Sequence, residues 1–444
     1  MSLVASEMKE AVDDDQSETA DLGARIKGDR VRELGSISGF DLVRIGPASE
    51  MHAEKLRYIE WVRSGRQGGM QWMTEERAAR SAAPTHALPA AQSVVSVGLS
   101  YWSGRRPPAG INRGKIARYA WGRDYHAVLG EKLEYFASAL RAEFGAEARW
   151  YVDTGPMMDK ALAARSGLGW YGKNTNILTE QFGSWVLLGE LLTDLILERD
   201  APLQRTCGSC RMCRVACPTG ALDTDYQIDG GKCISYLTIE HRGSIPRDLR
   251  PKMGDWVFGC DICQDVCPPT MQPYLKTAEE RREWLDQIKA HVQKRAQDCV
   301  QPKDTGEAAG VFRNHNFARA GAKMDVDLLE LLEITHDEYL AAFRGTSIRR
   351  AKVWMLRRNA AVALGNVGDR SVAPRLARSM QHDDHPIVRS HAAWALGRLA
   401  RRHDMPELAA SLAGAYASEP DPDVREEIAD ALRECEPVPT GVPD

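Results

Sequence analysis

Short apolar runs alternate with helical patterns through residues 25–195. The run S-V-V-S-V-G-L (93–99) predicts a buried strand, A-R-W-Y-V (148–152) predicts another strand, and a third apolar run covers 185–192. Between the first two runs, residues 132–144 carry apolar side chains at helical spacing. Strands that alternate with helices predict an α/β layered domain for this part of the chain.

The pattern changes to a helical repeat towards the C-terminus. The segment R-R-N-A-A-V-A-L-G (357–365) recurs as R-S-H-A-A-W-A-L-G (389–397), and a weaker copy covers 425–432. The period and the Ala/Leu pattern predict HEAT-like pairs of helices over 346–440. The commonest use of such repeats is as a protein–protein scaffold, which is an alternative to a catalytic or RNA-binding role.

Composition excludes several classes of protein. Of the 444 residues, 43% are hydrophobic and 27% are charged, as in ordinary soluble globular proteins of two or three domains. The net charge of −4 excludes a polycation, so any contact with nucleic acid must come from a local patch. No apolar run is long enough to predict a transmembrane helix. The polar, acidic N-terminus lacks the features of a secretory signal, so we expect a disordered lead (1–24) and a cytoplasmic protein.

The cysteines add chemistry that the hydrophobic pattern does not show. The ten are Cys207, Cys210, Cys213, Cys217, Cys233, Cys260, Cys263, Cys267, Cys299 and Cys435. The first four follow C-x2-C-x2-C-x3-C-P, the bacterial [4Fe–4S] run in which three thiolates bind one cluster and the fourth binds another. A partial run, C-x2-C-x3-C-P, begins at Cys260, and Cys233 can supply its missing ligand.

The ligand count therefore predicts two [4Fe–4S] clusters. Cluster one takes Cys207, Cys210, Cys213 and Cys267, and cluster two takes Cys217, Cys233, Cys260 and Cys263. The alternatives are zinc, which usually takes pairs of C-x2-C knuckles, and disulfides, which are rare in chains without an export signal. Cys299 and Cys435 are expected to be ordinary thiols. We expect a ferredoxin-like double-cluster domain (196–275), a helical connector (276–345) and a role in electron transfer.

A dense polar stretch precedes the cysteines. Asp153 follows a predicted strand, at the edge where α/β domains place their chemistry. Asp159 and Lys160 follow in a helical segment, and residues 167–176 form a glycine-rich loop whose backbone can approach a bulky ligand. A helix N-cap at Asp153 and a plain turn at 167–176 are the alternatives.

Together these pieces resemble the epoxyqueuosine reductases, cobalamin-dependent enzymes that complete queuosine in tRNA. The matching segments before the cysteines are M-Q-W-M (70–73), R-Y-A-W-G-R-D-Y-H (118–126), D-T-G-P (153–156), G-W-Y-G-K-N (169–174), G-S (183–184) and L-G-E-L-L (188–192). Those among the cysteines are C-P-T-G-A (217–221), C-I-S-Y-L-T-I-E (233–240) and G-C-D-I-C-Q (259–264). The resemblance covers residues 25–400, but the Arg and Asp-Pro pattern expected after M-Q-W-M is only partly kept (Arg77, Arg80, Pro84).

The resemblance implies a multidomain α/β plus α protein that reduces epoxyqueuosine to queuosine at the wobble position. It implies that 25–195 is the cobalamin-binding catalytic domain, where cob(II)/cob(I)alamin receives electrons from the clusters. It makes Asp153 the proton donor, with a pKa raised by burial beside the cofactor. The implied cofactor-binding residues are Arg118, Tyr119, Tyr125, His126, Asp153, Thr154, Lys173, Asn174 and Ser184. No D-x-H-x-x-G pattern occurs, so we expect no protein histidine on cobalt.

A basic strip at 344–358 carries six Arg or Lys and no acid. Such a strip neutralises phosphates, although a charge run is usually just a solvated face. Since the family acts on a tRNA anticodon loop, the tRNA-binding residues are expected to be Arg349, Arg350, Lys352, Arg357 and Arg358. Helical spacing predicts that three of these arginines (350, 357 and 358) form one cationic edge.

Other partners and functions complete the expectations. We expect an external low-potential electron donor, no membrane partner and a monomer. A reductive dehalogenase-like enzyme is one alternative, although such enzymes usually carry an export signal and lack a HEAT tail. A ferredoxin-like electron-transfer protein is the other, and it needs neither the α/β domain nor the basic repeat.

Overall fold

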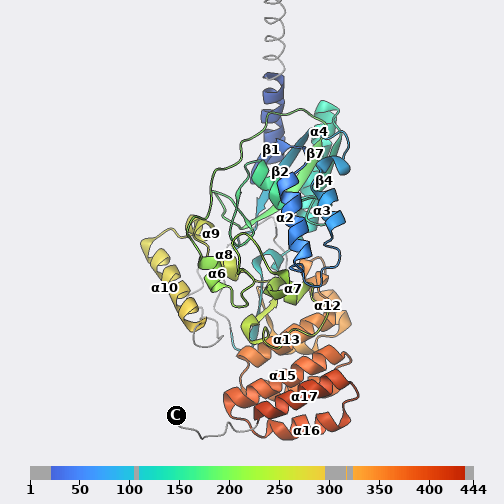
Figure 1. Cartoon of the computed structure of the whole chain (residues 1–444), viewed down its shortest axis with the longest axis vertical. Helices are drawn as coiled ribbons and strands as arrows, with labels where there is room; N and C mark the ends of the chain where they lie inside the picture. The colour runs from blue at the N-terminus through green and yellow to red at the C-terminus, as the bar shows by residue number, and fades with distance from the viewer. Residues whose placement is uncertain (1–21, 105–109, 296–316, 318–323, 436–444) are drawn as a thin grey trace, which may run out of the picture. The chain divides into compact units, whose positions relative to one another are not determined.

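The computed structural model describes residues 22–104, 110–295, 317 and 324–435 (Figure 1). The chain forms two compact units whose sequence segments are interleaved. The first unit comprises Met1–Gly65, Trp72–Trp102 and Tyr125–Cys210, and the second comprises Arg66–Gln71, Ser103–Asp124 and Arg211–Asp444. Most of the expected disordered lead, Cys299 and the last residues of the expected repeat domain lie outside the described residues.

A four-stranded antiparallel sheet is the middle layer of the first unit, in the order β1-β2-β7-β4. Its strands are β1 (Leu42–Pro47), β2 (Ser93–Ser100), β4 (Ala148–Tyr151) and β7 (Val186–Thr193). The helices are 22–37, α2 (His52–Arg63), α3 (Glu75–Ser81), η1 (Pro84–His86), α4 (Tyr125–Phe144) and α5 (Asp159–Arg165). A small hairpin joins β5 (Trp170–Tyr171) to β6 (Ile177–Leu178).

Helices cover both faces of this sheet, which explains why every residue of β2 is buried. Leu133 of α4 packs closely on β7, since a side chain at Gly189 would come within 2.9 Å of its Cδ1. Ala161 and Leu162 of α5 pack on the opposite face. The predicted α/β layered arrangement is confirmed, and so are the strands at 93–99 and 148–152 and the helix at 132–144. Residues 22–24, expected in the disordered lead, are helical.

The second unit contains a three-stranded sheet and many helices. The strands are β3 (Arg113–Ile116), β8 (Trp256–Phe258) and β9 (Asp325–Asp327), in the order β8-β3-β9. The elements near the cysteines are η2 (Arg118–Ala120), α6 (Met212–Ala216), η3 (Gly230–Lys232), α7 (Ile234–Ile239), η4 (Pro251–Met253), α8 (Ile262–Asp265), α9 (Pro268–Met271) and η5 (Gln272–Tyr274). The later helices are α10 (Ala278–Arg295), α11 (Leu328–Glu333), α12 (His336–Ala342), η7 (Ser347–Arg350), α13 (Val353–Val367), η8 (Arg370–Val372), α14 (Ala373–His382), α15 (Pro386–His403), α16 (Leu408–Ser418) and α17 (Pro422–Cys435).

The units differ from the expected domain boundaries in two ways. The segment 103–124, expected in the α/β domain, belongs to the second unit because β3 pairs with β8 and β9. The cluster segment, the connector and the repeats do not separate either. They share one hydrophobic core, in which Leu237 and Val257 belong to the same buried cluster as Leu356 and Leu364.

The predicted repeat copies form α13, α15 and α17, which pack side by side with α14 and α16 between them in sequence (Figure 1). The recurring Leu-Gly step explains the close packing. A side chain at Gly365 would come within 3.0 Å of the Ala395 Cα, and one at Gly397 within 2.8 Å of the Ala431 Cα. Larger residues would therefore push the helices apart.

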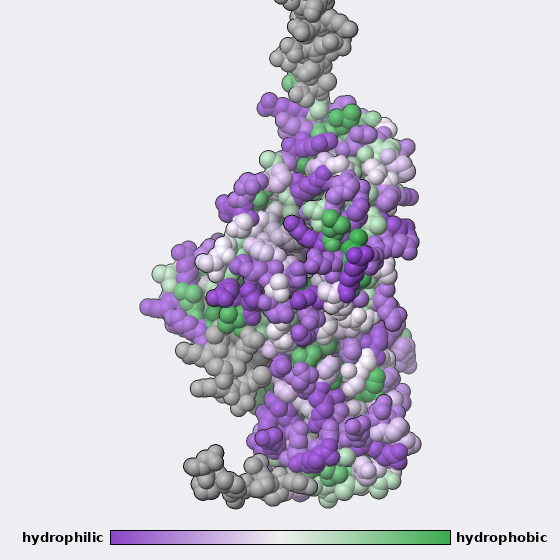
Figure 2. Space-filling view, viewed as in Figure 1, coloured by the Kyte–Doolittle hydropathy of each residue, from purple (hydrophilic) through white to green (hydrophobic). Residues whose placement is uncertain are grey.

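The surface of the repeats is mainly hydrophilic on the face shown in Figure 2. Within the described part of the chain, no helix has both the length and the apolar character needed to span a membrane.

Candidate active site and iron–sulfur ligands

Asp153 lies on the loop that follows β4. Its φ is 53°, in the left-handed region that aspartate tolerates better than most side chains. The carboxyl group is 62% exposed, so a bound molecule can reach it. Thr154 is also exposed, and Arg77 holds the loop by donating from Nη2 to the Gly155 oxygen at 3.1 Å.

Two aromatic rings at the start of α4 contact the Asp153 carboxylate. The Tyr125 hydroxyl donates to Asp153 Oδ2, and His126 Nε2 lies 3.6 Å from the same oxygen. Hydrogen bonding with His126, and then with Tyr125, lowers the pKa of Asp153. In the protein without cofactor these hydrogen bonds outweigh burial, and the pKa of Asp153 lies below its ordinary value. The rise expected from burial beside the cofactor stays a prediction.

Two more carboxyl groups lie deeper in the same unit. Glu190, in the middle of β7, is 0% exposed and accepts from Ser96 Oγ at 2.6 Å. Asp159 is the first residue of α5, which packs against β7. Oδ1 of Asp159 and Oε1 of Glu190 are both enclosed, and neither accepts a hydrogen bond from the described residues.

Burial changes the acidity of both groups. Burial, and then the charge of Asp153, raises the pKa of Asp159 to about 7. Burial, and then the charge of Asp159, raises the pKa of Glu190 well above its ordinary value. The acid with a raised pKa in this region is therefore Asp159, six positions after Asp153.

The glycine-rich segment 167–176 forms most of the β5–β6 hairpin. The Gly172 N–H donates to the Asn176 oxygen at 2.8 Å, and a side chain at Gly172 would come within 2.5 Å of Asn174 Oδ1. Glycine is thus needed for packing inside the hairpin. This favours the plain-turn alternative over a loop that opens to a ligand.

Three predicted cofactor-binding residues in this region, Lys173, Asn174 and Ser184, are buried. Lys173 Nζ donates to the Gly208 oxygen at 2.7 Å. Gly208 lies between Cys207 and Cys210, so Lys173 links the hairpin to the first cysteine loop.

Six of the eight predicted cluster ligands lie in the second unit, at the ends of short elements. Cys213 lies in α6 and Cys217 ends it, Cys233 precedes α7, Cys260 follows β8, Cys263 lies in α8 and Cys267 precedes α9. The other two lie at the end of the first unit, where the Cys210 N–H donates to the Cys207 oxygen at 3.0 Å.

The thiols of the second unit lie close enough to act on one another. Burial, followed by Cys233, Cys217, Cys213 and Cys267, raises the pKa of Cys263 well above its ordinary value. Every described cysteine is a free thiol in this structure. A group of enclosed, mutually close thiols fits an iron–sulfur cluster, whose irons replace the protons on sulfur.

Arg118 holds the second cysteine loop. Its side chain is 3% exposed and donates from Nη1 to Asp261 Oδ2 at 3.0 Å and to Asp265 Oδ1 at 2.8 Å. These two acids flank Cys263 in sequence. The neighbouring Tyr119 packs on Phe258, with ring centroids 6.1 Å apart. Arg118 and Tyr119, predicted to bind the cofactor, therefore belong to the second unit and contact its cluster segment.

Arg358 is not part of a surface edge, and that prediction is wrong. It is 0% exposed and donates to the backbone oxygens of Leu237, His241 and Gly243 at 2.7–2.8 Å. Its neighbour Asn359 donates to the oxygens of Thr238 and Val257, each at 2.9 Å. Both side chains therefore hold the segment that follows Cys233.

The other strip residues are nearer the surface but do not form one helical edge. Arg350 lies in η7, before α13, and its Nε lies 2.7 Å from Glu240 Oε1. Arg357 pairs with Asp383 at 3.3 Å. Arg349 and Lys352 are exposed.

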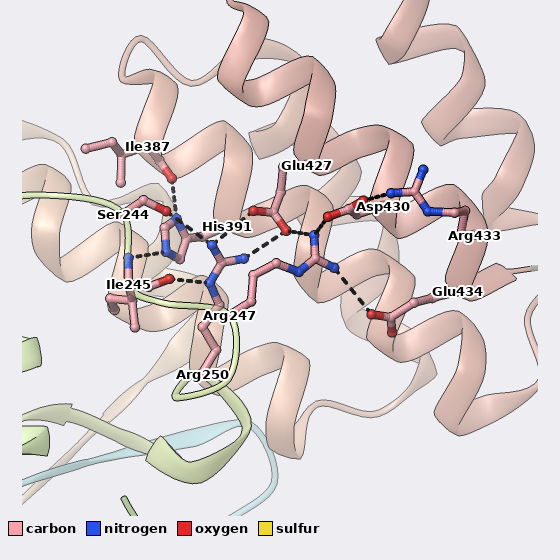
Figure 3. A network of polar contacts seen from close by, with 10 residues as sticks. All are labelled: Ser244, Ile245, Arg247, Arg250, Ile387, His391, Glu427, Asp430, Arg433 and Glu434. Atoms are coloured by element: carbon pink, nitrogen blue, oxygen red, sulfur yellow. Dashed lines mark hydrogen bonds and ion pairs between the residues drawn. The ribbon is translucent and has the colours of Figure 1, made fainter. Parts of the chain in front are cut away.

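A polar network joins the segment after α7 to α15 and α17 (Figure 3). Buried Arg250 lies with Nη1 3.0 Å from Glu427 Oε1, and its Nε donates to the Ile245 oxygen at 2.8 Å. His391, also buried, accepts from the Ile245 N–H at 3.1 Å. Arg247 adds ion pairs to Glu427, Asp430 and Glu434. The repeats are thus fastened to the cluster segment by buried charge.

Sequence reasoning missed the roles of three of these residues. Glu190 is the only acid in the run W-V-L-L-G-E-L-L (185–192), and a lone charge in an apolar strand is a signal of a buried carboxyl group. Arg250 and Arg358 gave no such signal, because each lies in an ordinary polar context.

A double-cluster segment in the same chain as an α/β unit with an accessible acid defines an iron–sulfur oxidoreductase. Three family models match: "Epoxyqueuosine reductase QueG, DUF1730" at residues 82–154, "4Fe-4S double cluster binding domain" at 206–270 and "HEAT repeats" at 346–433. The matches confirm the double-cluster domain and the HEAT-like repeats that the sequence predicted.

Known proteins are similar to this chain in sequence and in structure over most of its length. An epoxyqueuosine reductase from Synechocystis sp. is 36% identical over 320 residues, or 71% of this chain and 98% of the relative. A crystal structure of epoxyqueuosine reductase with a modified tRNA-Tyr stem loop has a TM-score of 0.76 at 30% identity, covering 92% of this chain and 98% of that one. A structure from Bacillus subtilis has a TM-score of 0.74 at 30% identity, covering 91% and 98%. The chain belongs to the epoxyqueuosine reductase family, as the resemblance implied.

Proposed function

We propose that this chain reduces epoxyqueuosine to queuosine in the anticodon of tRNA, with cobalamin and two [4Fe–4S] clusters as cofactors. Family membership over most of the chain carries this proposal. Removing an epoxide oxygen to leave a carbon–carbon double bond takes two electrons and two protons and releases one water. The chain must therefore supply protons at one site and conduct electrons to it.

Asp153 is the proton donor to the leaving oxygen. It is accessible, and Tyr125 and His126 hold its carboxyl group at Oδ2. The related Bacillus subtilis structure was described with an aspartate-containing catalytic loop swung out of the active site. The left-handed φ of Asp153 supports a loop with more than one position, because such a conformation is costly for a non-glycine residue.

The accessible edge around Asp153 suits cobalamin. Tyr125, His126 and Thr154 offer polar groups and ring faces there, and each is partly or fully exposed. A corrin ring with amide side chains needs both kinds of contact. When bound, cobalamin supplies a low-potential electron donor for opening the strained ring. Buried Lys173, Asn174 and Ser184 support the hairpin behind this edge, and Arg118 and Tyr119 support the cluster loop.

For the clusters we keep the division of the eight cysteines that the sequence predicted. Among the thiols whose charge raises the pKa of Cys263, Cys233 and Cys217 have the largest effect. Cys263 and Cys233 have the same role for Cys260. These mutual effects support one cluster on the four cysteines. The second cluster takes Cys207, Cys210, Cys213 and Cys267. Anaerobic reconstitution should give about eight irons per chain, and Cys233→Ala should keep about four. Retention of both clusters in Cys233→Ala would overturn the partition.

The tRNA is held through its phosphates by exposed cations near the repeats. Arg349 and Lys352 are exposed, and Arg350 and Arg357 can exchange an acidic partner for a phosphate. Arg358 contributes only by supporting this surface from inside. The chain works as a cytoplasmic monomer that takes electrons from an external low-potential donor.

One assay tests the whole proposal. Protein reconstituted anaerobically with iron, sulfide and cobalamin is given a chemical reductant and tRNA that carries epoxyqueuosine. We expect queuosine as the product, and a loss of about 10²–10⁴-fold in kcat for Asp153→Asn with cobalamin and tRNA binding retained. Full activity of Asp153→Asn would remove this residue from the mechanism. Turnover of an aryl halide but not of the tRNA would favour the dehalogenase alternative, and cobalamin-free protein that only passes electrons would favour the ferredoxin-like one.

A further inference from the structure

The proton balance of the reaction is not met by Asp153 alone. Each turnover consumes two protons, and Asp153 carries at most one. Its interactions with His126 and Tyr125 stabilise the charged form, so it does not regain a proton readily at neutral pH. A neighbouring acid that still carries a proton at neutral pH can return one to it.

We propose that Asp159, backed by Glu190, resupplies Asp153 with the protons that epoxide removal consumes; this inference rests on the proposed function. The exposure of the three carboxyl groups decreases from Asp153 through Asp159 to Glu190. Asp153 is 62% exposed, Asp159 is half-buried with Oδ1 enclosed, and Glu190 is 0% exposed. Neighbouring members of this series act on each other electrostatically.

The fold places Asp159 and Glu190 on one side of the sheet. Side chains alternate along β7, so Glu190 projects from the same face as Leu192, which packs against Ala161 and Leu162 of α5. Asp159 starts this helix. Ser96, opposite Glu190 in the register of β2, donates to Oε2 and leaves Oε1 without a partner among the described residues.

An enclosed carboxyl oxygen without a partner is tolerated when the group carries a proton, because a neutral acid costs far less to bury than a carboxylate. The charged and titratable groups that face Asp159 are Asp153, Lys160, Arg77 and Tyr171, in addition to Glu190. Lys160 and Arg77 favour its ionised form, but burial and the charge of Asp153 outweigh them and raise the pKa of Asp159 to about 7. Near neutral pH this residue can therefore both give and regain a proton.

The transfer itself is simple. Asp153 protonates the oxygen as the ring opens and becomes a carboxylate, and Asp159 passes one proton to it. Asp153 gives this second proton to the departing hydroxyl group, which leaves as water, and Asp159 then recovers protons from solvent and returns one to Asp153. No electrons move in these steps. Glu190 stays neutral in the protein interior. If Glu190 were charged instead, its repulsion would raise the pKa of Asp159 further and keep its proton from leaving.

Infrared spectroscopy tests the protonation without any activity assay. Protonated carboxyl groups have a carbonyl stretching band separate from that of carboxylates. We expect such bands in the cobalamin-free protein at about pH 6, with one component that titrates near pH 7. Asp159→Asn should remove the titrating band, Glu190→Gln should remove a second band, and the exposed control Glu198→Gln should change neither. The absence of any protonated-carboxyl band at about pH 6 would overturn the proposal.

Kinetics test the relay. In the reconstituted holoenzyme, kcat should fall as pH rises above about 7, since Asp159 loses its stored proton there. Asp159→Asn should lower kcat about 100-fold with KM unchanged and remove this pH dependence, whereas Asp159→Glu should recover most of the rate. A kcat for Asp159→Asn within about twofold of wild type would refute the relay. If wild type does not turn over at all, the proposed function fails, while the infrared titration still reports on Asp159.

Discussion

Two arginines of the second unit and two acids of the first unit are partnered in different ways. Arg358 is buried and donates from Nε and both Nη atoms, and buried Arg250 donates from Nε to the Ile245 oxygen and pairs with Glu427. In the first unit, Asp159 and Glu190 each keep an enclosed oxygen without a partner among the described residues. The first arrangement is what a structural charge requires, and the second is what a proton store requires.

The number of hydrogen-bond partners, and not the degree of burial, distinguishes a structural charge from a reactive one. A buried charge with every hydrogen bond made resists change, because removing it leaves several polar groups unsatisfied. A buried acid with a free oxygen costs stability, and that cost persists where function depends on it. Four predictions test this division, in order of decreasing expected effect.

Arg358→Met should cause the largest loss. It leaves the oxygens of Leu237, His241 and Gly243 without their donor, so the free energy of unfolding should fall by about 3–5 kcal/mol. The second cluster should be lost with it, because these oxygens belong to the segment after Cys233. Denaturant unfolding and iron analysis measure both. Arg350→Met, at a 55% exposed ion pair, is the matched control and should cost less than about 1 kcal/mol. Equal effects of the two substitutions would contradict the comparison.

Glu427→Gln should have the next largest effect. Arg250 and Arg247 both pair with this carboxylate, and Arg250 is buried, so its charge would be left without compensation (Figure 3). We expect a loss of about 2–4 kcal/mol in chemical denaturation. The adjacent exposed residue gives the control, since Glu426→Gln should stay within about 0.5 kcal/mol of wild type. A wild-type unfolding midpoint for Glu427→Gln would show that the network is not structural.

Glu190→Gln should stabilise the protein, opposite to the first two. An acid whose pKa is raised in the folded state holds its proton more tightly there, so the unfolded state gains by ionising once pH exceeds about 4.5. Wild-type stability should therefore fall as pH rises from about 4.5, and the amide variant should escape this loss. We expect Glu190→Gln to be more stable by about 1 kcal/mol or more at about pH 8 and equal to wild type near pH 4, measured by thermal unfolding. Destabilisation at pH 8 would place Glu190 with the structural charges.

The exposed cations belong to neither group and should have the smallest effect. Arg349→Ala combined with Lys352→Ala should leave stability unchanged and weaken tRNA binding about 3–10-fold at physiological salt. The dependence of binding on salt should become shallower by about one ion for each phosphate that the protein no longer neutralises. Lys289→Ala on α10 is the control for a change of charge elsewhere. Unchanged tRNA affinity in the double variant would leave the repeats without a direct role in RNA binding.

Local patterns predicted much of the fold. The apolar run at 93–99 predicted β2 because a strand buried on both faces leaves a continuous apolar signature. The strand β4 was predicted as well, although none of its four residues is fully buried. Ala/Leu spacing gave α13, α15 and α17, and the cysteine spacing gave the double-cluster domain that the family model matches. The interleaving of 103–124 with the second unit escaped prediction, because the pairing of β3 with β8 joins segments that are far apart in sequence.

The site was predicted less completely for a related reason. Asp153 and its neighbours Tyr125 and His126 are brought together as the family resemblance implied. The contacts of His126 and Tyr125 that lower the pKa of Asp153 in the cofactor-free protein could not be predicted, because no pattern of apolar residues describes this loop. Arg358 was wrongly placed at the surface, because helical spacing says which residues share a face but not which face is covered. Both features arise from tertiary packing.

The attachment of α13 to the segment after Cys233 makes iron content a determinant of heat resistance in the repeats. A cluster that binds only the folded protein adds stability by mass action, and Arg358 and Asn359 pass that stability on to the helix that carries them. Oxygen damage to the cluster on Cys233 should therefore lower the melting temperature of helices that hold no iron. Air oxidation should therefore weaken the proposed binding of tRNA by destabilising the repeats, with no change in the exposed cations themselves.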